Sequence, residues 1–170
     1  HAIEGYITKG AWIMSDMYEL QAIKMIAENL PIAVEEPTNP VGREGMALAQ
    51  YIAAQAFSNV GLGLVHGMAH PMGSLHDIPH GVANALLLPT IMEFNMPTRI
   101  EKYGIIAQHM GVDTTGMTPE EAAQAYIVEE IVGENDAEIL ATESKGELSS
   151  DEIQALNIPE EFAEGINAVE

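Results

Sequence analysis

The sequence contains no cysteine, and this absence limits the kinds of site that it can build. Disulfide frameworks and thiolate metal sites are excluded, which leaves histidine and carboxylate side chains as the strong metal ligands. Apolar residues make up 47% of the 170 residues, so the composition is that of a globular protein and not of a disordered one. A chain of this length suits one domain with a sizeable core, and its lack of cysteine is compatible with the cytoplasm, where we expect the protein.

Basic side chains are also scarce, and the resulting charge excludes one class of partner. There are six lysine and arginine residues against 26 aspartate and glutamate residues, which gives a net charge of −20. The imbalance is greatest beyond residue 110, where Lys145 is the single basic residue beside sixteen acidic ones. A chain with so few cations cannot neutralise phosphates, so we expect no nucleic-acid partner. The acidic segment is interpreted as a solvated surface.

One long stretch lacks charged residues altogether. From Gly45 to His76 there is no Asp, Glu, Lys or Arg, and the stretch is long enough to suggest a membrane span. Polar residues inside it, among them Gln50, Gln55 and Asn59, argue together with its histidines for a buried helix that lines a polar site. The chain also begins without the basic and then apolar pattern of a secretory leader. We therefore expect no membrane span and no membrane partner.

Apolar residues recur at every third or fourth position along much of the chain, which is typical of helices. They predict a helix over residues 2–29, a proline-rich loop over 31–42, and a second helix over about 43–70 that Pro71 ends. Nothing alternates with a period of two over a useful length. The sequence therefore predicts an all-α fold, a helical bundle.

Three further helices are predicted from residues that commonly begin or end helices. One should begin near Pro79, with Asp77 as its cap, and another should cover residues 99–110, before a glycine. Thr118 and Glu121 have the spacing of a capping box, so a fifth helix should begin there.

Histidine is concentrated in one short window. Four of the six histidines lie between residues 66 and 80, namely His66, His70, His76 and His80. On a helix, His66 and His70 are one turn apart on one face, a spacing suited to metal chelation, and His80 follows after a short loop. A set of core or surface histidines that are merely hydrogen-bonded is the alternative. Four histidines so close together favour a catalytic metal site built from histidine and carboxylate.

Residues 61–67 carry glycines at a spacing superficially like that of a dinucleotide-binding turn. Such a turn follows a strand and opens a helix, with an acidic residue about twenty positions later. Here a predicted helix precedes the glycines, and Asp77 comes too soon. Packing against a neighbouring helix is the better interpretation of these glycines.

Three segments resemble the signature segments of iron-containing alcohol dehydrogenases: HAIEGY at 1–6, FSNVGLGLVHGMAHP at 57–71 and PHGVAN at 79–84. MALAQY at 46–51 and EKYGIIA at 101–107 are most similar to the lactaldehyde reductase branch of that family. The resemblance covers about residues 1–120. It implies that this region is the helical, metal-binding C-terminal domain of a two-domain subunit whose N-terminal α/β domain binds NAD.

The chain accordingly divides into two parts. Residues 1–120 are expected to form the helical metal-binding domain. Residues 121–170 are expected to be an acidic, divergent tail of the same domain, with short helices at 149–156 and 159–169.

The resemblance also implies roles for individual residues. His1, His66 and His80 match three histidine ligands of a divalent metal, Fe²⁺ or Zn²⁺, and the family's fourth ligand, an aspartate, would lie one turn upstream of His1. His70 matches a histidine beside the metal that is not a ligand, so the resemblance implies a catalytic role near the nicotinamide or in proton transfer. Phe57 matches a residue near the substrate pocket.

The function implied by the resemblance is a metal-dependent, NAD-linked alcohol dehydrogenase or aldehyde reductase of the lactaldehyde to 1,2-propanediol type. Its partners would be a small alcohol or aldehyde substrate and, in the complete enzyme, further copies of itself in a homodimer or larger homo-oligomer. The residues that hold NAD would lie outside this sequence, so the chain is expected to be an inactive fragment of an enzyme. A non-catalytic helical metal-binding or interaction module is the alternative.

Overall fold

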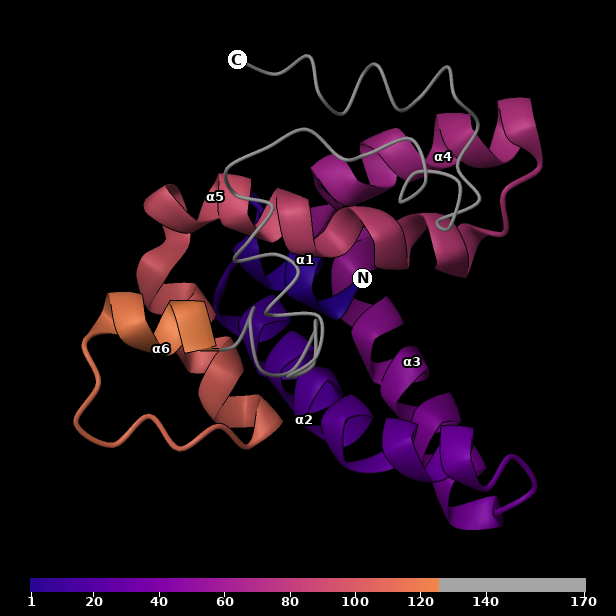
Figure 1. Cartoon of the computed structure of the whole chain (residues 1–170), viewed down its shortest axis with the longest axis horizontal. Coiled ribbons are helices and arrows are strands. Elements are labelled where there is room, and N and C mark those ends of the chain that lie inside the picture. The colour runs from indigo at the N-terminus through magenta and orange to yellow at the C-terminus, as the bar shows by residue number, and fades with distance from the viewer. Residues whose placement is uncertain (126–170) are drawn as a thin grey trace, which may run out of the picture. The chain divides into compact units, whose positions relative to one another are not determined.

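Residues 1–125 are the part of the chain that the computed structural model describes, and they fold into six α-helices without any strand (Figure 1). The helices are α1 (Ala2–Ile7), α2 (Ile13–Glu35), α3 (Pro40–Val60), α4 (Leu64–His76), α5 (His80–Met110) and α6 (Pro119–Ala125). The predicted all-α fold is confirmed for these residues. The helices predicted at 149–156 and 159–169 lie outside the described residues, and the division of the chain at residue 120 stays a prediction.

The single helix predicted over 2–29 is wrong in one respect, because the chain breaks between α1 and α2. Residues 8–12 leave the helix, and Gly10 passes so close to the end of α3 that a Cβ there would lie 2.8 Å from the carbonyl oxygen of Val60. α2 then begins at a local cap. The Trp12 amide donates to Ser15 Oγ at 2.9 Å, and that hydroxyl donates to the Trp12 carbonyl oxygen at 2.8 Å.

Proline does not end the helices where the sequence predicts a stop. Pro31 lies inside α2 and Pro71 inside α4. Both prolines are exposed, so water can bond the carbonyl group that each leaves without its helical donor. The long helix predicted over about 43–70 is broken instead at 61–63, because Gly61 has a φ of +80°, a backbone conformation that favours glycine.

α5 unites two helices that the sequence predicts separately. The helix expected near Pro79 and the one expected over 99–110 are continuous, with a kink at Arg99, whose φ of −142° is not helical. Gly111 ends α5 with a φ of +98°, which agrees with the predicted glycine stop. The prediction that Asp77 caps this helix is wrong. Asp77 instead ends α4 in a left-handed conformation, at a φ of 55°.

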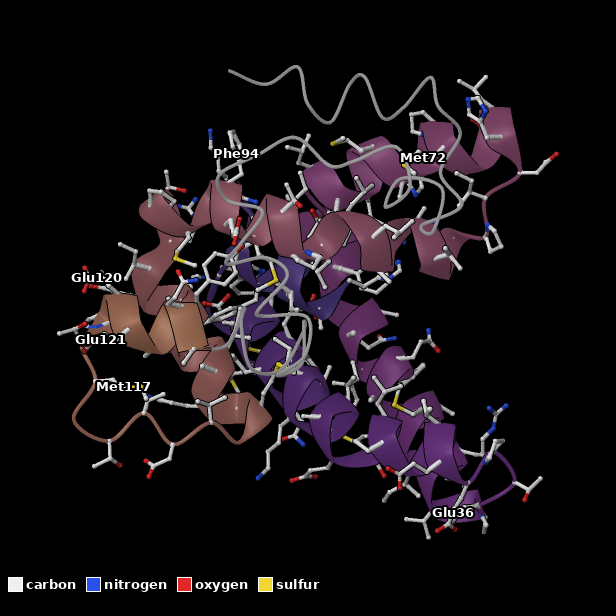
Figure 2. The ribbon with its side chains drawn as sticks, in the orientation of Figure 1. Glu36, Met72, Phe94, Met117, Glu120 and Glu121 are labelled. Carbon is white, nitrogen blue, oxygen red and sulfur yellow. The ribbon has the colours of Figure 1, made fainter. Side chains whose placement is uncertain are left out.

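The predicted capping box is present at the start of α6. The Glu121 amide donates to Thr118 Oγ1 at 3.2 Å, and the Thr118 amide donates to a Glu121 carboxylate oxygen at 2.7 Å. Glu120 and Glu121 project from the outer side of this first turn, where negative charge suits the positive end of the helix (Figure 2). Ala122 and Ala123 are buried on the opposite side, which packs against α5.

α2 and α3 lie side by side, and small residues allow their close approach (Figure 1). Gly42 of α3 faces α2 so closely that a Cβ would lie 2.8 Å from the backbone nitrogen of Ala33. The apolar core joins α1, α2, α3, α5 and α6, and its largest fully buried apolar side chains all come from α5: Tyr103, Met92 and Ile106.

The C-terminal end of α1 is held by two cationic side chains of α5. Lys102 Nζ donates to the Tyr6 carbonyl oxygen at 2.6 Å and lies 3.2 Å from the carboxylate of Asp16. Arg99 Nε donates to the Ile7 carbonyl oxygen at 2.9 Å. Positive charge at this end complements the helix dipole and satisfies carbonyl groups that the helix itself cannot pair. α1 is therefore fixed firmly against α5.

The uncharged stretch from Gly45 to His76 is divided between α3 and α4. Within residues 1–125 no helix combines the length and apolar character needed to cross a membrane.

Candidate metal centre

Three histidines from separate parts of the chain meet at one point. His1 precedes α1, His66 lies in the first turn of α4, and His80 is the first residue of α5. One ring nitrogen of each lies within 4.8 Å of the others, and His1 Nε2 is 3.0 Å from His66 Nε2. Two nitrogens bound to one tetrahedral ion at about 2.05 Å would lie about 3.3 Å apart. Small side-chain movements would therefore fit all three histidines to a single ion.

Glu4, to which the sequence alone gives no role, lies directly behind His66. Its Oε2 is 2.6 Å from His66 Nδ1 and 3.3 Å from the His66 amide nitrogen, and its Oε1 accepts a hydrogen bond from the Val65 amide at 2.8 Å. The carboxylate thus caps the first turn of α4, where the N-cap residue, Gly63, has no side chain to do so. A Cβ on Gly63 would lie 2.7 Å from Oε1. This close approach to Glu4, rather than the packing of two helices, explains why residue 63 is a glycine.

The sequence places Glu4 near His1 but does not indicate its contact with His66. Glu4 follows His1 by three residues and therefore shares a face of α1 with it. Its partner His66 is 62 positions away in the sequence, and no local pattern indicates that contact.

The charge state of the Glu4 and His66 pair follows from burial and hydrogen bonding, since both residues are buried. Burial acts to raise the pKa of Glu4, but hydrogen bonds from the His66 ring and from backbone amides together outweigh it and hold the pKa below its usual range. Burial is the largest influence on the pKa of His66 and lowers it, whereas Glu4 raises it, and the net result is a pKa below the usual range. The favoured pair is a carboxylate with a neutral imidazole. Nδ1–H then donates to Glu4, and Nε2 keeps its lone pair on the side of His1.

Two other residues that the resemblance implicates lie beside these histidines. His70, one turn after His66, is exposed, and its ring centre is 5.8 Å from that of His66 and 5.6 Å from that of His80. Phe57, in the last turn of α3, has its ring centre 4.8 Å from that of His1. The group of nitrogens that could share an ion comprises His1, His66 and His80 and does not include His70. The geometry thus favours this group over a chelate of His66 with His70.

His80 is held by its own helix. Asn84, one turn later, places Nδ2 2.9 Å from His80 Nε2 and donates to the His80 carbonyl oxygen at 2.8 Å. Besides His70, two further histidines lie outside the metal-binding group. His76 is the last residue of α4, and His109, in the last turn of α5, has Nδ1 2.9 Å from the Ile105 carbonyl oxygen.

Glu19 of α2 provides a second buried carboxyl group that packs against α1. It is fully buried, neither carboxyl oxygen has a hydrogen-bond partner among the described residues, and a Cβ on Gly5 would overlap Oε1. Burial raises the pKa of Glu19 to about 8, and the negative charge of Asp16 acts in the same direction. The backbone amide of Phe57 favours the charged form only weakly, because it lies outside hydrogen-bond geometry. Glu19 is therefore largely protonated at neutral pH, whereas Glu4 is ionised.

The donor set fits a borderline divalent ion. Neutral imidazoles bind Fe²⁺ and Zn²⁺ alike, and their chemistry does not choose between these two ions. His1, His70 and His80 are exposed, whereas His66 is buried, so one side of the group is open to a small molecule and the other is fixed in the fold. An all-helical domain with this arrangement is a candidate metal-binding domain.

Comparison with known families agrees with that class. Residues 1–136 match the family described as "Fe-containing alcohol dehydrogenase family, C-terminal". The chain therefore belongs to the iron-containing alcohol dehydrogenase family and corresponds to its C-terminal domain.

Individual relatives support the same assignment. The chain is 53% identical over 127 residues to lactaldehyde reductase of Escherichia coli K12, and this aligned region covers 75% of this chain and 33% of that protein. It is 46% identical over 127 residues to 1,3-propanediol dehydrogenase of Citrobacter freundii, with the same shares covered, 75% and 33%. A crystal structure of 1,3-propanediol oxidoreductase matches with a TM-score of 0.77 at 37% identity, over 97% of this chain and 42% of that one. The chain spans about a third of the length of the curated relatives that it matches.

Proposed function

We propose that this chain is the metal-binding domain of a metal-dependent, NAD-linked alcohol dehydrogenase or aldehyde reductase of the lactaldehyde and 1,2-propanediol type. The observation that carries the proposal is the convergence of His1, His66 and His80 in a member of this family. The names of the relatives, lactaldehyde reductase and 1,3-propanediol dehydrogenase, support a small alcohol or aldehyde as the substrate.

A divalent ion bound by the three histidines would supply Lewis acidity toward the substrate oxygen, and NAD bound by an N-terminal domain would exchange hydride with the substrate carbon. Within this chain, buried His66 provides a fixed imidazole. Phe57, beside His1, provides an apolar wall against a short carbon chain. His70 is exposed and lies next to His66 and His80, so its ring can carry a proton between the substrate hydroxyl group and solvent.

A metal titration tests the site assignment. The chain is stripped with a chelator and titrated with Zn²⁺ against a chromophoric competitor, and with Fe²⁺ under anaerobic conditions. His66→Ala and His80→Ala should each lose most of the affinity, because each removes one of three ligands. His109→Ala is the matched control, since His109 lies outside the metal-binding group and bonds its own helix. Equal zinc affinity in all four proteins would refute the site.

Turnover requires a nucleotide-binding domain. Joined to the N-terminal part of the Escherichia coli relative, the chain should oxidise NADH in the presence of lactaldehyde, and by itself it should not. A non-catalytic metal-binding module would bind zinc equally well but would give no turnover in this fusion.

A further inference from the structure

We propose that Glu4 is the positioning residue of the metal centre, which orients the His66 ring toward the ion and holds α1 and α4 at the separation that lets His1 and His66 share that ion. This inference rests on the proposed metal site and adds a residue to it. Glu4 does not contact the ion in this role and acts through His66.

Glu4 fixes the orientation of the His66 imidazole. The 2.6 Å contact of Oε2 with His66 Nδ1 is short, as expected of a hydrogen bond to an ionised acceptor. Nδ1–H then points to Glu4, and Nε2, 3.0 Å from His1 Nε2, is the nitrogen left to bind an ion. A carboxylate that accepts from the second nitrogen of a ligand histidine fixes its tautomer and ring orientation and makes it a stronger ligand.

Glu4 also links two helices. Glu4 stands on α1, three residues after His1, and receives hydrogen bonds from two amides at the start of α4 and from the His66 ring. These donors occupy both carboxylate oxygens of a residue that is only 2% exposed. The carboxylate therefore fixes the segment that carries His1 relative to the segment that carries His66.

Glu4 also brings negative charge close to the proposed ion. The three proposed ligands are neutral imidazoles when bound, so they do not offset the charge of a divalent ion. A carboxylate one imidazole away lowers the net charge around the ion, and its own cost of burial is met by three donors. Apolar residues at this position would leave the Val65 and His66 amides without acceptors.

The test compares zinc affinity in the full chain for the wild type, Glu4→Gln and Glu4→Ala. Glu44→Gln is the matched control, because it removes the same charge from an exposed position of α3. Glu4→Ala should bind zinc about 10–100-fold more weakly, the range typical for loss of a partner that orients a metal ligand. Glu4→Gln, which keeps one acceptor oxygen, should fall between wild type and Glu4→Ala, and Glu44→Gln should bind as the wild type does.

A metal-free measurement separates orientation from general damage. Long-range ¹H–¹⁵N spectra of the chelator-treated chain report which ring nitrogen of His66 carries the proton. Wild type should have the Nδ1–H tautomer, and Glu4→Ala should shift toward Nε2–H while its far-UV circular dichroism stays helical. If Glu4→Ala proves unfolded, Glu4→Gln carries the test.

The outcomes are distinguishable. Zinc affinity that is unchanged in both Glu4 variants but lost in His66→Ala would overturn the role of Glu4 and leave the metal site standing. An Nε2–H tautomer of His66 in the wild type would also overturn it. Zinc affinity that His66→Ala does not reduce would instead refute the proposed metal site itself.

Discussion

The buried carboxyl group of Glu19 should make the stability of this domain fall as the pH rises, opposite to the effect of a salt-bridged carboxylate. Glu19 is fully buried and neither of its carboxyl oxygens has a hydrogen-bond partner within residues 1–125, so the folded state strongly favours its protonated form. Its pKa rises from 4.5 to about 8 on folding. Between these values the folded chain binds a proton that the unfolded chain has released. The contribution of Glu19 to stability is therefore complete below pH 4.5 and is lost as the pH rises toward 8.

The size of the effect follows from proton linkage. Each pH unit between the two pKa values corresponds to about 1.4 kcal/mol in the free energy of unfolding. Integrated from pH 5 to pH 7, the contribution of Glu19 falls by about 2.5 kcal/mol. A domain of this size is stable by only about 5–15 kcal/mol, so this loss is readily measured.

Glu19→Gln isolates this contribution, because glutamine keeps the shape of the side chain and does not ionise. The free energy of unfolding is measured by urea denaturation at pH 5, 6, 7 and 8, with a chelator in every sample. The stability of Glu19→Gln relative to wild type should rise by about 2.5 kcal/mol between pH 5 and pH 7. A buried amide adds a constant offset, so the slope is the informative quantity.

Glu35→Gln is the control, because Glu35 lies on the same helix and is exposed. Its pH profile should run parallel to that of the wild type. If the Glu19→Gln profile also runs parallel to the wild type, the Glu19 carboxyl group is not held protonated by the fold, and the reasoning from its burial fails.

Three other perturbations have expected results. In a complete enzyme, His70→Ala should keep its metal but turn over about 10²–10⁴-fold more slowly, as for loss of a general acid–base group; metal loss equal to that of a ligand variant would contradict the proposed role. Lys102→Met should lower the free energy of unfolding, measured in urea, by about 1–3 kcal/mol, because it removes the charged donor to α1. Lys24→Met, which removes an exposed ion pair at 3.9 Å, should change it by less than about 0.5 kcal/mol. Gly61→Ala should cost about 1–3 kcal/mol because its φ is +80°, and Gly67→Ala, a helical site with open space around its Cβ, should be neutral or stabilising; equal effects would rule out backbone strain at Gly61.

The helix class and several helix ends could be predicted from local sequence because their causes are local. The capping box at Thr118 and Glu121 and the stop at Gly111 depend on residues a few positions apart, and both are present as predicted. The breaks near Gly10 and Gly61 were not predicted, because apolar periodicity continues through both. The break near Gly10 depends on the close approach of two distant segments, and the break near Gly61 depends on a backbone angle. Apolar periodicity gives no information about either.

Part of the candidate site could likewise be predicted from the sequence, and part could not. The histidine window drew attention to His66, His70 and His80 through spacing alone, and the family resemblance added His1 and Phe57. Neither the histidine spacing nor the family resemblance indicated Glu4, because its proposed role depends on a contact with His66, 62 positions away in the sequence. Pro71 illustrates the opposite error, since a residue that usually ends helices is tolerated at an exposed position of α4.

The position of both His1 and Glu4 at α1 has a consequence for how tightly an ion can be held. Tertiary contacts hold α1 in place, among them the hydrogen bonds from Lys102 and Arg99 to its last carbonyl groups. Because His1 and Glu4 both depend on these contacts, any local opening of α1 would remove a proposed ligand and the orienting carboxylate together. The measured affinity equals the intrinsic affinity multiplied by the fraction of molecules in which α1 is docked. By the same linkage, an ion that binds only the docked form slows hydrogen exchange at the α1 amides, far more than in the last turns of α5.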